Sequence, residues 1–262
     1  MLQPANGHRD NALEVLRTEN DMLKAQLMNS SLINELSKVM QSCTDVEGIT
    51  KTLLLGIQEI LLFDRVILFE IDAAGFCLRP RSWVGIGAQE VAGFKVPLGF
   101  EGGEVTDSIF LNRHVLVDYE DGLFSGQLGS TTYLVIPLLN KATMKCWEHK
   151  SCTKTTCPAH GGHNPYCWSI PGAGDHPDVI SEDERRRRCL QCQCFKAEGV
   201  FWMDRAHHQQ PITSDDITIL TTIINQAGII LENFRIRGAL ENANGELSSA
   251  NSRLKRVNRE LE

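Results

Sequence analysis

The segment FDRVILFEID, residues 63–72, contains a nearly continuous apolar run that is rich in β-branched side chains. A short run of this kind is typical of a strand that is buried on both faces. The residues Ala73, Ala74 and Gly75 follow it and favour a turn, so a second strand is expected over 76–84. This segment therefore predicts two successive strands joined by a short turn.

Outward from these strands, the sequence predicts an α+β fold. Further strands are expected over 114–117, 131–139 and 200–204, and helices over 31–62, 105–112 and 217–234. The first of these helices is expected to break near Thr44 and Asp45, which have the character of a helix cap. Thr213 and Asp216 have the spacing of a capping box before the last helix. The glycine-rich stretch 97–103 is expected to be a loop.

Both ends of the chain carry leucines at alternating spacings of three and four residues, the pattern of a coiled coil. The N-terminal heptad positions are Leu13, Leu16, Asn20, Leu23 and Leu27. The C-terminal heptad positions are Leu240, Ala243, Leu247, Ala250, Leu254, Val257 and Leu261. Polar helices of this kind need a partner helix, so a parallel coiled-coil homodimer is expected. The expected organisation is a coiled-coil helix over 1–30, a globular domain over 31–235 and a second coiled coil over 236–262.

The composition excludes several classes of protein. The chain has 262 residues, of which 42% are hydrophobic, and a formal net charge of −7, so non-specific nucleic-acid binding is disfavoured. The longest apolar run is far shorter than the ~18 residues of a membrane span, so none is expected. No charged segment followed by an apolar stretch opens the chain, so no export signal is visible and a cytoplasmic location is expected.

Cysteine is the unusual residue, because seven of the nine cysteines fall within residues 146–194. These seven are Cys146, Cys152, Cys157, Cys167, Cys189, Cys192 and Cys194. In a reducing compartment such a cluster is more often a metal site than a set of disulfides. The pair Cys189 and Cys192 has the spacing of two thiolates that bind one ion from a tight turn. The four arginines 185–188 are interpreted as a solvated charge run that balances the acidic residues 182–184.

The order of these elements resembles a GAF domain, with 146–195 as an insertion between two strands. The matching segments are FDRVILFEID (63–72), the loop and helix 99–112, HVLVDYED (114–121), STTYLVIPLLNK (130–141) and the stretch 198–233. The resemblance implies an antiparallel sheet with flanking helices and a small-molecule pocket on one sheet face. The pocket candidates are Trp83, Phe100, Tyr133, Asp204 and Arg205, of which the last two could pair with one another. Of the signature residues found in members that bind cyclic nucleotides, only Asp216 has a match, which disfavours that ligand.

The insertion resembles the cysteine-rich "two-CW" module of bacterial sensory proteins. The matching segments are CWEHKSC (146–152), CPAH (157–160), CWSIPG (167–172) and CLQC (189–192). The module often has a further cysteine after its second Cys-Trp pair; here Asp175 or His176 would take its place, and His176 is the preferred metal candidate. Three interpretations stay open: an iron–sulfur cluster, slightly preferred, one or two zinc ions, and a thiol switch.

Together these resemblances imply a regulatory sensory module of bacterial signal transduction. It would sense redox state, a gas or a small ligand and relay the change through its helices to a downstream output module or partner protein. One alternative is a zinc-stabilised dimerisation or docking module without redox sensing. Another is a GAF-type methionine sulfoxide reductase with Cys77 as nucleophile, but no second core cysteine has an evident place near it, and enzymatic activity is not expected.

Overall fold

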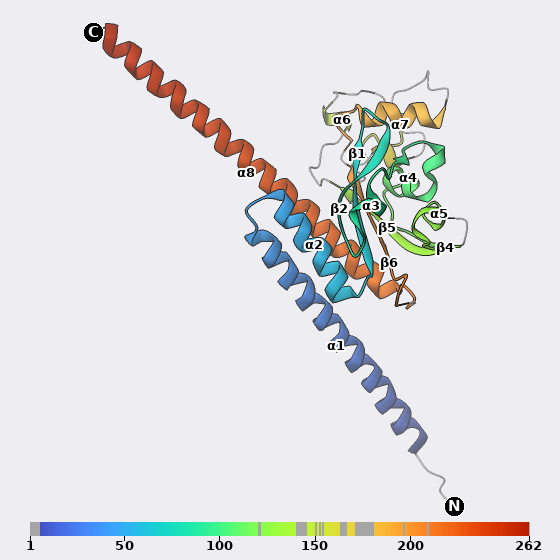
Figure 1. Cartoon of the computed structure of the whole chain (residues 1–262). Coiled ribbons are helices and arrows are strands. Elements are labelled where there is room, and N and C mark those ends of the chain that lie inside the picture. Colours follow the sequence, from blue (N-terminus) through green and yellow to red (C-terminus); the bar gives the residue numbers. More distant parts are fainter. Residues whose placement is uncertain are drawn as a thin grey trace, which may run out of the picture.

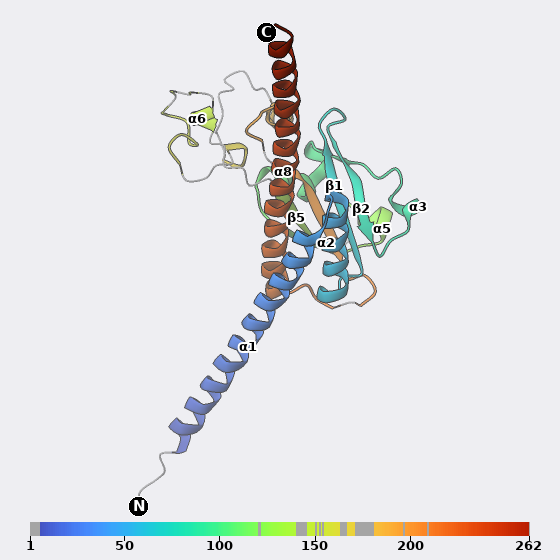
Figure 2. The ribbon, with the colours of Figure 1, turned by 90° about the vertical axis from the view of Figure 1, so that its left-hand side faces the viewer.

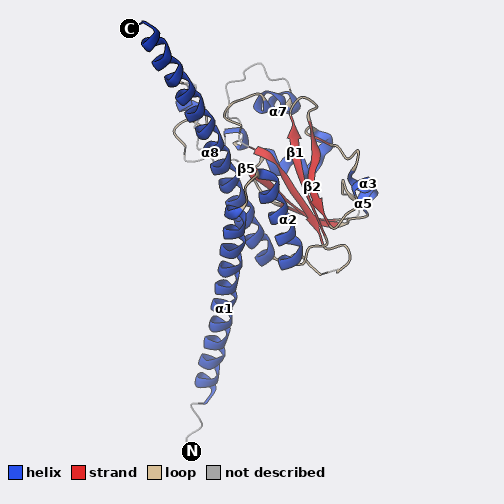
Figure 3. Ribbon diagram, turned by 60° about the vertical axis from the view of Figure 1, so that its left-hand side comes forward, coloured by secondary structure: helices blue, strands red, loops and turns tan. Residues whose placement is uncertain are grey.

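A computed structural model of the chain describes residues 6–119, 122–139, 146–149, 151, 153, 155–162, 167–170, 181–195, 197–208 and 210–261. Its centre is a six-stranded sheet in the order β3-β2-β1-β6-β5-β4, in which every neighbouring pair is antiparallel (Figure 3). The strands are β1 (Arg65–Asp72), β2 (Cys77–Val84), β3 (Val96–Pro97), β4 (Val115–Asp118), β5 (Thr132–Leu139) and β6 (Ala197–Asp204). The predicted α+β class with an antiparallel sheet is confirmed.

One face of the sheet is covered by three helices: α1 (Asn6–Ser42), α2 (Val46–Leu61) and the first half of α8 (Ser214–Leu261). Short elements cover the other face, namely α3 (Ala88–Val91), α4 (Gly103–Phe110) and α5 (Ser125–Leu128), and η1 (Phe100–Gly102) leads directly into α4. The inserted segment contributes α6 (Cys146–His149), η2 (Cys167–Ser169) and α7 (Glu182–Leu190). The predicted helix over 105–112 therefore begins two residues earlier, and the predicted loop over 97–103 contains η1.

The two sheet faces belong to two separate hydrophobic clusters. In β1, Val66 and Leu68 pack into the cluster under the helices, whereas Ile67 and Phe69 pack into the cluster on the opposite face. Successive side chains of a strand point to opposite faces, so a strand covered on both sides must be apolar at consecutive positions. The burial of β1 on both faces explains the continuous apolar run from which this strand was predicted.

The helix ends follow from capping side chains. Asp45 accepts a hydrogen bond from the Gly48 amide at 2.6 Å and caps α2, which confirms the predicted break near Thr44 and Asp45. At the start of α8, the Thr213 hydroxyl accepts from the Asp216 amide at 3.2 Å, and the Asp216 carboxylate accepts from the Thr213 amide at 2.8 Å. The predicted capping box is therefore confirmed.

Helices α1 and α8 lie side by side at the sheet and extend away from it in opposite directions (Figures 1 and 2). Helix α8 is continuous, so the expected boundary at residue 235 lies within one helix rather than at a break. Its predicted heptad residues Leu240, Leu247 and Leu254 are exposed, as are Leu16 and Leu23 of α1.

The span Ser214–Val257 of α8 is long and apolar enough to cross a membrane by length and composition, and 39% of its apolar window is buried in the fold. The buried residues include Leu220, Ile224 and Leu231, which pack against the sheet. The mostly buried core helix of a soluble protein passes the same test.

Candidate functional site

The cysteine-rich insertion leaves the sheet between two neighbouring strands. Strands β5 and β6 are hydrogen-bonded partners, with Tyr133 opposite Asp204 and Leu139 opposite Ala197. The residues between Leu139 and Ala197 are therefore inserted into a hairpin, as the sequence predicts. Figure 1 shows α6 and α7 at the same end of the sheet.

Polar and cationic contacts attach helix α7 to the domain. The Arg186 guanidinium donates to the Asp107 carboxylate of α4 at 2.8 Å, and Arg187 lies 3.8 Å from the ring centroid of Phe76. The Asp183 carboxylate accepts from the backbone amide of Phe100 at 3.1 Å. Arg186 is also buried. The arginine run is therefore not simply a solvated surface, because it holds α7 against the core.

Aromatic side chains make a second set of contacts between the insertion and the core. The ring centroids of Trp168 and Phe195 are 4.9 Å apart. The ring centroid of Phe195 lies 5.7 Å from that of Phe110 in α4. Trp168 is almost fully buried in the cluster on this sheet face, with Leu190 packed against the same cluster. The described part of the insertion thus forms a cover over this face of the domain.

Several of the predicted metal ligands lie on turns of this cover. Cys189 is in the last turn of α7, and its carbonyl accepts from the Cys192 amide at 2.9 Å, so the predicted tight turn is present. Cys157, Cys167, Cys189 and Cys192 are half-buried, whereas Cys194 is buried. The predicted ligands Cys152 and His176 and the side chain of Cys146 lie outside the described residues.

Arg185 places two of these cysteines in one neighbourhood. The pKa of Arg185 is raised, first by its hydrogen bonds to Glu182 and also by its proximity to the sulfur atoms of Cys189 and Cys167. It donates to the backbone carbonyl of Trp168 at 3.1 Å as well. Two segments that are 22 residues apart in sequence therefore meet at one arginine.

The donor set fits a thiophilic metal by its chemistry, since thiolates are the ligands of zinc and iron–sulfur sites. Among the residues that the structure describes, no three His, Cys, Asp or Glu side chains converge as a metal site.

The five predicted pocket residues lie in different environments. Phe100 is 88% exposed, whereas Tyr133 and Asp204 are fully buried and Trp83 packs at the margin of the same cluster as Tyr133. Asp204 pairs with Arg65 and Arg205 pairs with Asp216, so the expected contact between Asp204 and Arg205 does not form. Neighbouring residues at a strand end point to opposite sides, which separates these two side chains.

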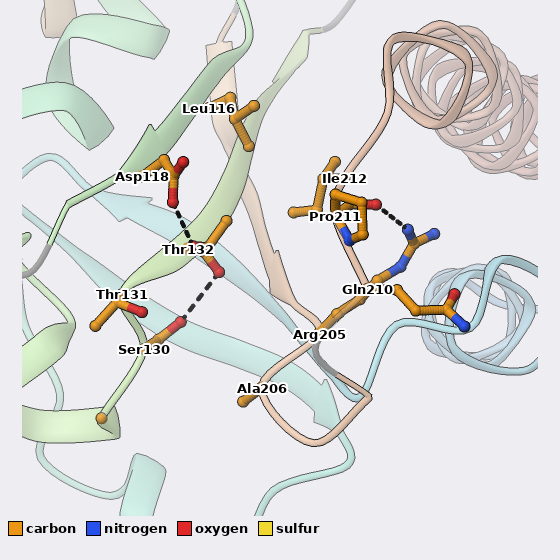
Figure 4. Close-up of a pocket in the computed structure, with 11 residues that line it drawn as sticks. Leu116, Asp118, Ser130, Thr131, Thr132, Arg205, Ala206, Gln210, Pro211 and Ile212 are labelled. Atoms are coloured by element: carbon orange, nitrogen blue, oxygen red, sulfur yellow. Dashed lines mark hydrogen bonds between the residues drawn. The ribbon is translucent and has the colours of Figure 1, made fainter.

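Arg205 lines a polar cavity of about 560 Å³ at the corner of the sheet (Figure 4). Leu116, Asp118 and Thr132 form one wall, and Pro211 and Ile212 lie opposite. The Arg205 guanidinium donates to the Pro211 carbonyl at 2.9 Å and both Asp216 oxygens at 3.0 Å. Its charge is therefore already neutralised by Asp216 and does not favour an anionic ligand in this cavity.

Several polar contacts were not predicted from the sequence. Asp64 accepts from the backbone amides of His207 and His208 and contacts the His208 ring. Burial alone would raise the pKa of Asp64, but these donors outweigh it and lower the pKa. The antiparallel pairing of β1 with β6 brings Asp64 close to His207 and His208, and a single sequence does not reveal that pairing.

The two cysteines of the core occupy separate places. The Cys77 thiol lies 3.9 Å from the Asp72 carboxylate at the β1–β2 turn. The Cys43 thiol donates to the Val39 carbonyl at 3.4 Å and contacts Thr52. These contacts share no residue, so the two thiols lie in separate environments among the described residues.

Burial makes Tyr133 a sensitive probe of this core. Burial, and secondly the charge of Glu104, raise the pKa of Tyr133 to about 12. Since the unfolded phenol ionises near pH 10, this group leaves stability unchanged below pH 10 and lowers it above. We expect the free energy of unfolding to fall by about 2–3 kcal/mol between pH 10 and 12 through this residue.

Phenolate absorbance during an alkaline titration measures this ionisation directly. One of the three tyrosines should ionise about two pH units later than the others, and Tyr133→Phe should remove that late step. Ionisation of all three tyrosines in a single step near pH 10 would contradict the burial of Tyr133.

No family model matches the chain, and no curated protein matches it significantly. Its structure is similar to the GAF domain of an Acinetobacter phosphoenolpyruvate-protein phosphotransferase, with 9% identity and a TM-score of 0.51 over 81% of this chain and 98% of that one. It is also similar to the GAF domain of the Coxiella burnetii phosphotransferase, with 11% identity and a TM-score of 0.50 over 80% and 96% of the two chains. The sheet order, the flanking helices and these two likenesses together identify the fold of this chain as that of a GAF domain.

Proposed function

We propose that this chain is a regulatory sensory module of bacterial signal transduction. The observation that carries the proposal is the continuity of α8 from Ser214 to Leu261. Its first half supplies buried residues of the core, such as Leu220 and Ile224, and its second half presents an exposed heptad pattern. A displacement of the sheet would therefore move α8 directly, and the exposed half of α8 can pair with another helix outside the domain.

The proposed partner of that helix is a second copy of the chain. Leu240, Leu247 and Leu254 of α8 and Leu16, Leu23 and Leu27 of α1 are exposed at heptad spacing. Burying them in a parallel coiled coil removes apolar surface from water, which stabilises the pair. The output belongs to a downstream module or partner protein that reads this coiled coil, as in multidomain signalling proteins.

The proposed input is a metal site in the cysteine-rich insertion. Its thiolates would come from the seven clustered cysteines, with His176 as a further ligand. An iron–sulfur cluster supplies reversible one-electron redox chemistry when it is bound, which suits the sensing of redox state or gases. Contacts such as that of Arg186 with Asp107 attach the insertion to the domain, so the order of the insertion is linked to that of the domain. A small ligand in the domain pocket is the second proposed input.

A zinc-stabilised docking module is the second candidate function. It is favoured by the cover that Trp168, Phe195 and Arg186 form over the sheet, since such a cover is a structural role in itself. Zinc would then hold the insertion in shape without any redox step. Catalysis as a methionine sulfoxide reductase has less support, because Cys77 and Cys43 have no shared contact.

Metal analysis of protein purified without oxygen tests the input. We expect iron with acid-labile sulfide and a broad visible absorption band, which would support a redox or gas sensor. A colourless protein with about one or two zinc ions per chain would favour the docking module instead. Protein that contains neither metal, and takes up neither on reconstitution, would contradict both.

A further inference from the structure

Glu198 and Arg235 form a two-point ion pair between β6 and α8. Both guanidinium nitrogens of Arg235 bond to the Glu198 carboxylate, one of them at 2.9 Å. These hydrogen bonds are the largest influence that raises the pKa of Arg235. Paired contacts of this kind fix the geometry of both side chains more firmly than a single contact.

Glu198 occupies a β-bulge at the exit of the cysteine-rich insertion. In the pairing of β5 with β6, Leu138 lies opposite Gly199 and Leu139 lies opposite Ala197, so Glu198 is the extra residue. The register with β1 also ends at Gly199. A bulge interrupts the ladder and re-aims its side chain. The side chain of Glu198, four residues after Cys194, is thereby directed at α8 rather than into the ladder.

Arg235 lies where α8 leaves the domain. Leu231, one turn earlier, is 4% exposed, and Ile236, the next residue, is 55% exposed. The helix also passes close to the same end of the sheet, because a Cβ added at Gly228 would lie 2.5 Å from the Leu139 carbonyl oxygen. The Glu198–Arg235 pair is therefore a contact of the sheet with α8 just before the exposed heptads.

The space around this pair allows it to move. A cavity of about 350 Å³ is bounded by Leu190 and Phe195 of the insertion, Ile71 of β1, and Glu198 and Arg235 themselves. Glu70 lines the same cavity and also acts on the charge of Arg235. Glu198 and Arg235 therefore lie beside a second carboxylate, and they share a cavity with residues of the insertion.

We infer that the Glu198–Arg235 pair transmits the state of the cysteine-rich insertion to α8. This inference rests on the proposed metal-binding function of the insertion. Ordering of the segment Cys189–Cys194 by metal fixes the entry into β6, and the bulge then holds Glu198 against Arg235. Loss of that order frees the bulge, and α8 loses its attachment at the point where its exposed part begins.

Hydrogen exchange of the full chain tests the inference, with zinc(II) reconstituted under argon and with zinc removed by a chelator. In the wild-type chain, zinc removal should speed amide exchange over residues 232–245 at least about fivefold, the lower end of typical coupling. Glu198→Gln should bind zinc equally but lose this zinc dependence. Glu241→Gln, which removes the same charge from an exposed position of α8, should keep it.

A charge swap distinguishes transmission from general damage. Glu198→Arg combined with Arg235→Glu restores opposite charges and should recover the zinc dependence, whereas Glu198→Arg alone should not. Equal zinc dependence in the wild type and in Glu198→Gln would overturn the inference while leaving the proposed function intact. A wild-type chain that takes up neither zinc nor an iron–sulfur cluster would overturn the proposed metal input and this inference together.

Discussion

Replacing Cys189 and Cys192 together by alanine should reduce the metal content of the chain to less than a tenth of the wild-type value. The two thiols flank a tight turn, with the Cys189 carbonyl bonded to the Cys192 amide at 2.9 Å. Two ligands from one turn are lost at once, and the site loses the pair with the spacing of a metal-binding turn. Structural sites of this kind bind with about 10–16 kcal/mol, so the loss should be nearly complete.

Metal analysis and hydrogen exchange together measure this result. The described part of the insertion, including Trp168 and Cys194, should lose exchange protection, whereas the strands of the sheet should keep theirs. Cys43→Ala is the matched control, because this cysteine lies between α1 and α2 and should leave the metal content unchanged. Unchanged metal content in the double variant would show that the site lies elsewhere.

Asp204→Ala should lower the free energy of unfolding by about 3–5 kcal/mol. Asp204 is fully buried and lies directly opposite Arg65 in the register of β1 with β6. Its carboxylate accepts two of the three hydrogen bonds that the Arg65 guanidinium donates, one of them at 3.0 Å. Without it, Arg65 keeps only the Leu128 carbonyl at 2.8 Å and the face of Trp202, which leaves a buried charge unpaired.

Urea unfolding followed by circular dichroism measures this loss. The double variant Arg65→Met with Asp204→Leu should be within about 2 kcal/mol of the wild type, because no charge is left behind. Asp72→Ala removes a carboxylate from a solvent-facing pair with Arg79 and should cost much less than Asp204→Ala. A loss below about 1 kcal/mol in Asp204→Ala would argue against a desolvated pair.

The elements with a clear period were predictable. The run in β1 and the caps at Asp45 and Thr213 are local patterns, and the structure places each of them as expected. The boundaries of the helices and strands were less predictable. For example, β6 begins at Ala197 rather than at residue 200. Residues 197–199 are polar or small, so their pairing with β5 leaves no hydrophobic pattern in the sequence.

The contacts between distant segments were not predictable in the same way. Arg186 appears in the sequence as one member of a charged run, and nothing local indicates that it is buried against Asp107. Phe100 appears as an aromatic pocket residue but lies exposed on η1. Both outcomes depend on how α7 packs against the core. A single sequence gives the chemistry of each side chain, but it does not identify a partner that lies about 80 residues away.

The side-by-side arrangement of α1 and α8 has a consequence for how influences combine. The Ser37 hydroxyl of α1 bonds to Gln226 of α8, and both helices cover the same sheet face. A rotation of α1 would therefore reach α8 without passing through the sheet, while the insertion acts on α8 through the strands. The free energies that the two influences contribute to the position of α8 would add. One influence alone could then be too small to change the helix, whereas both together change it.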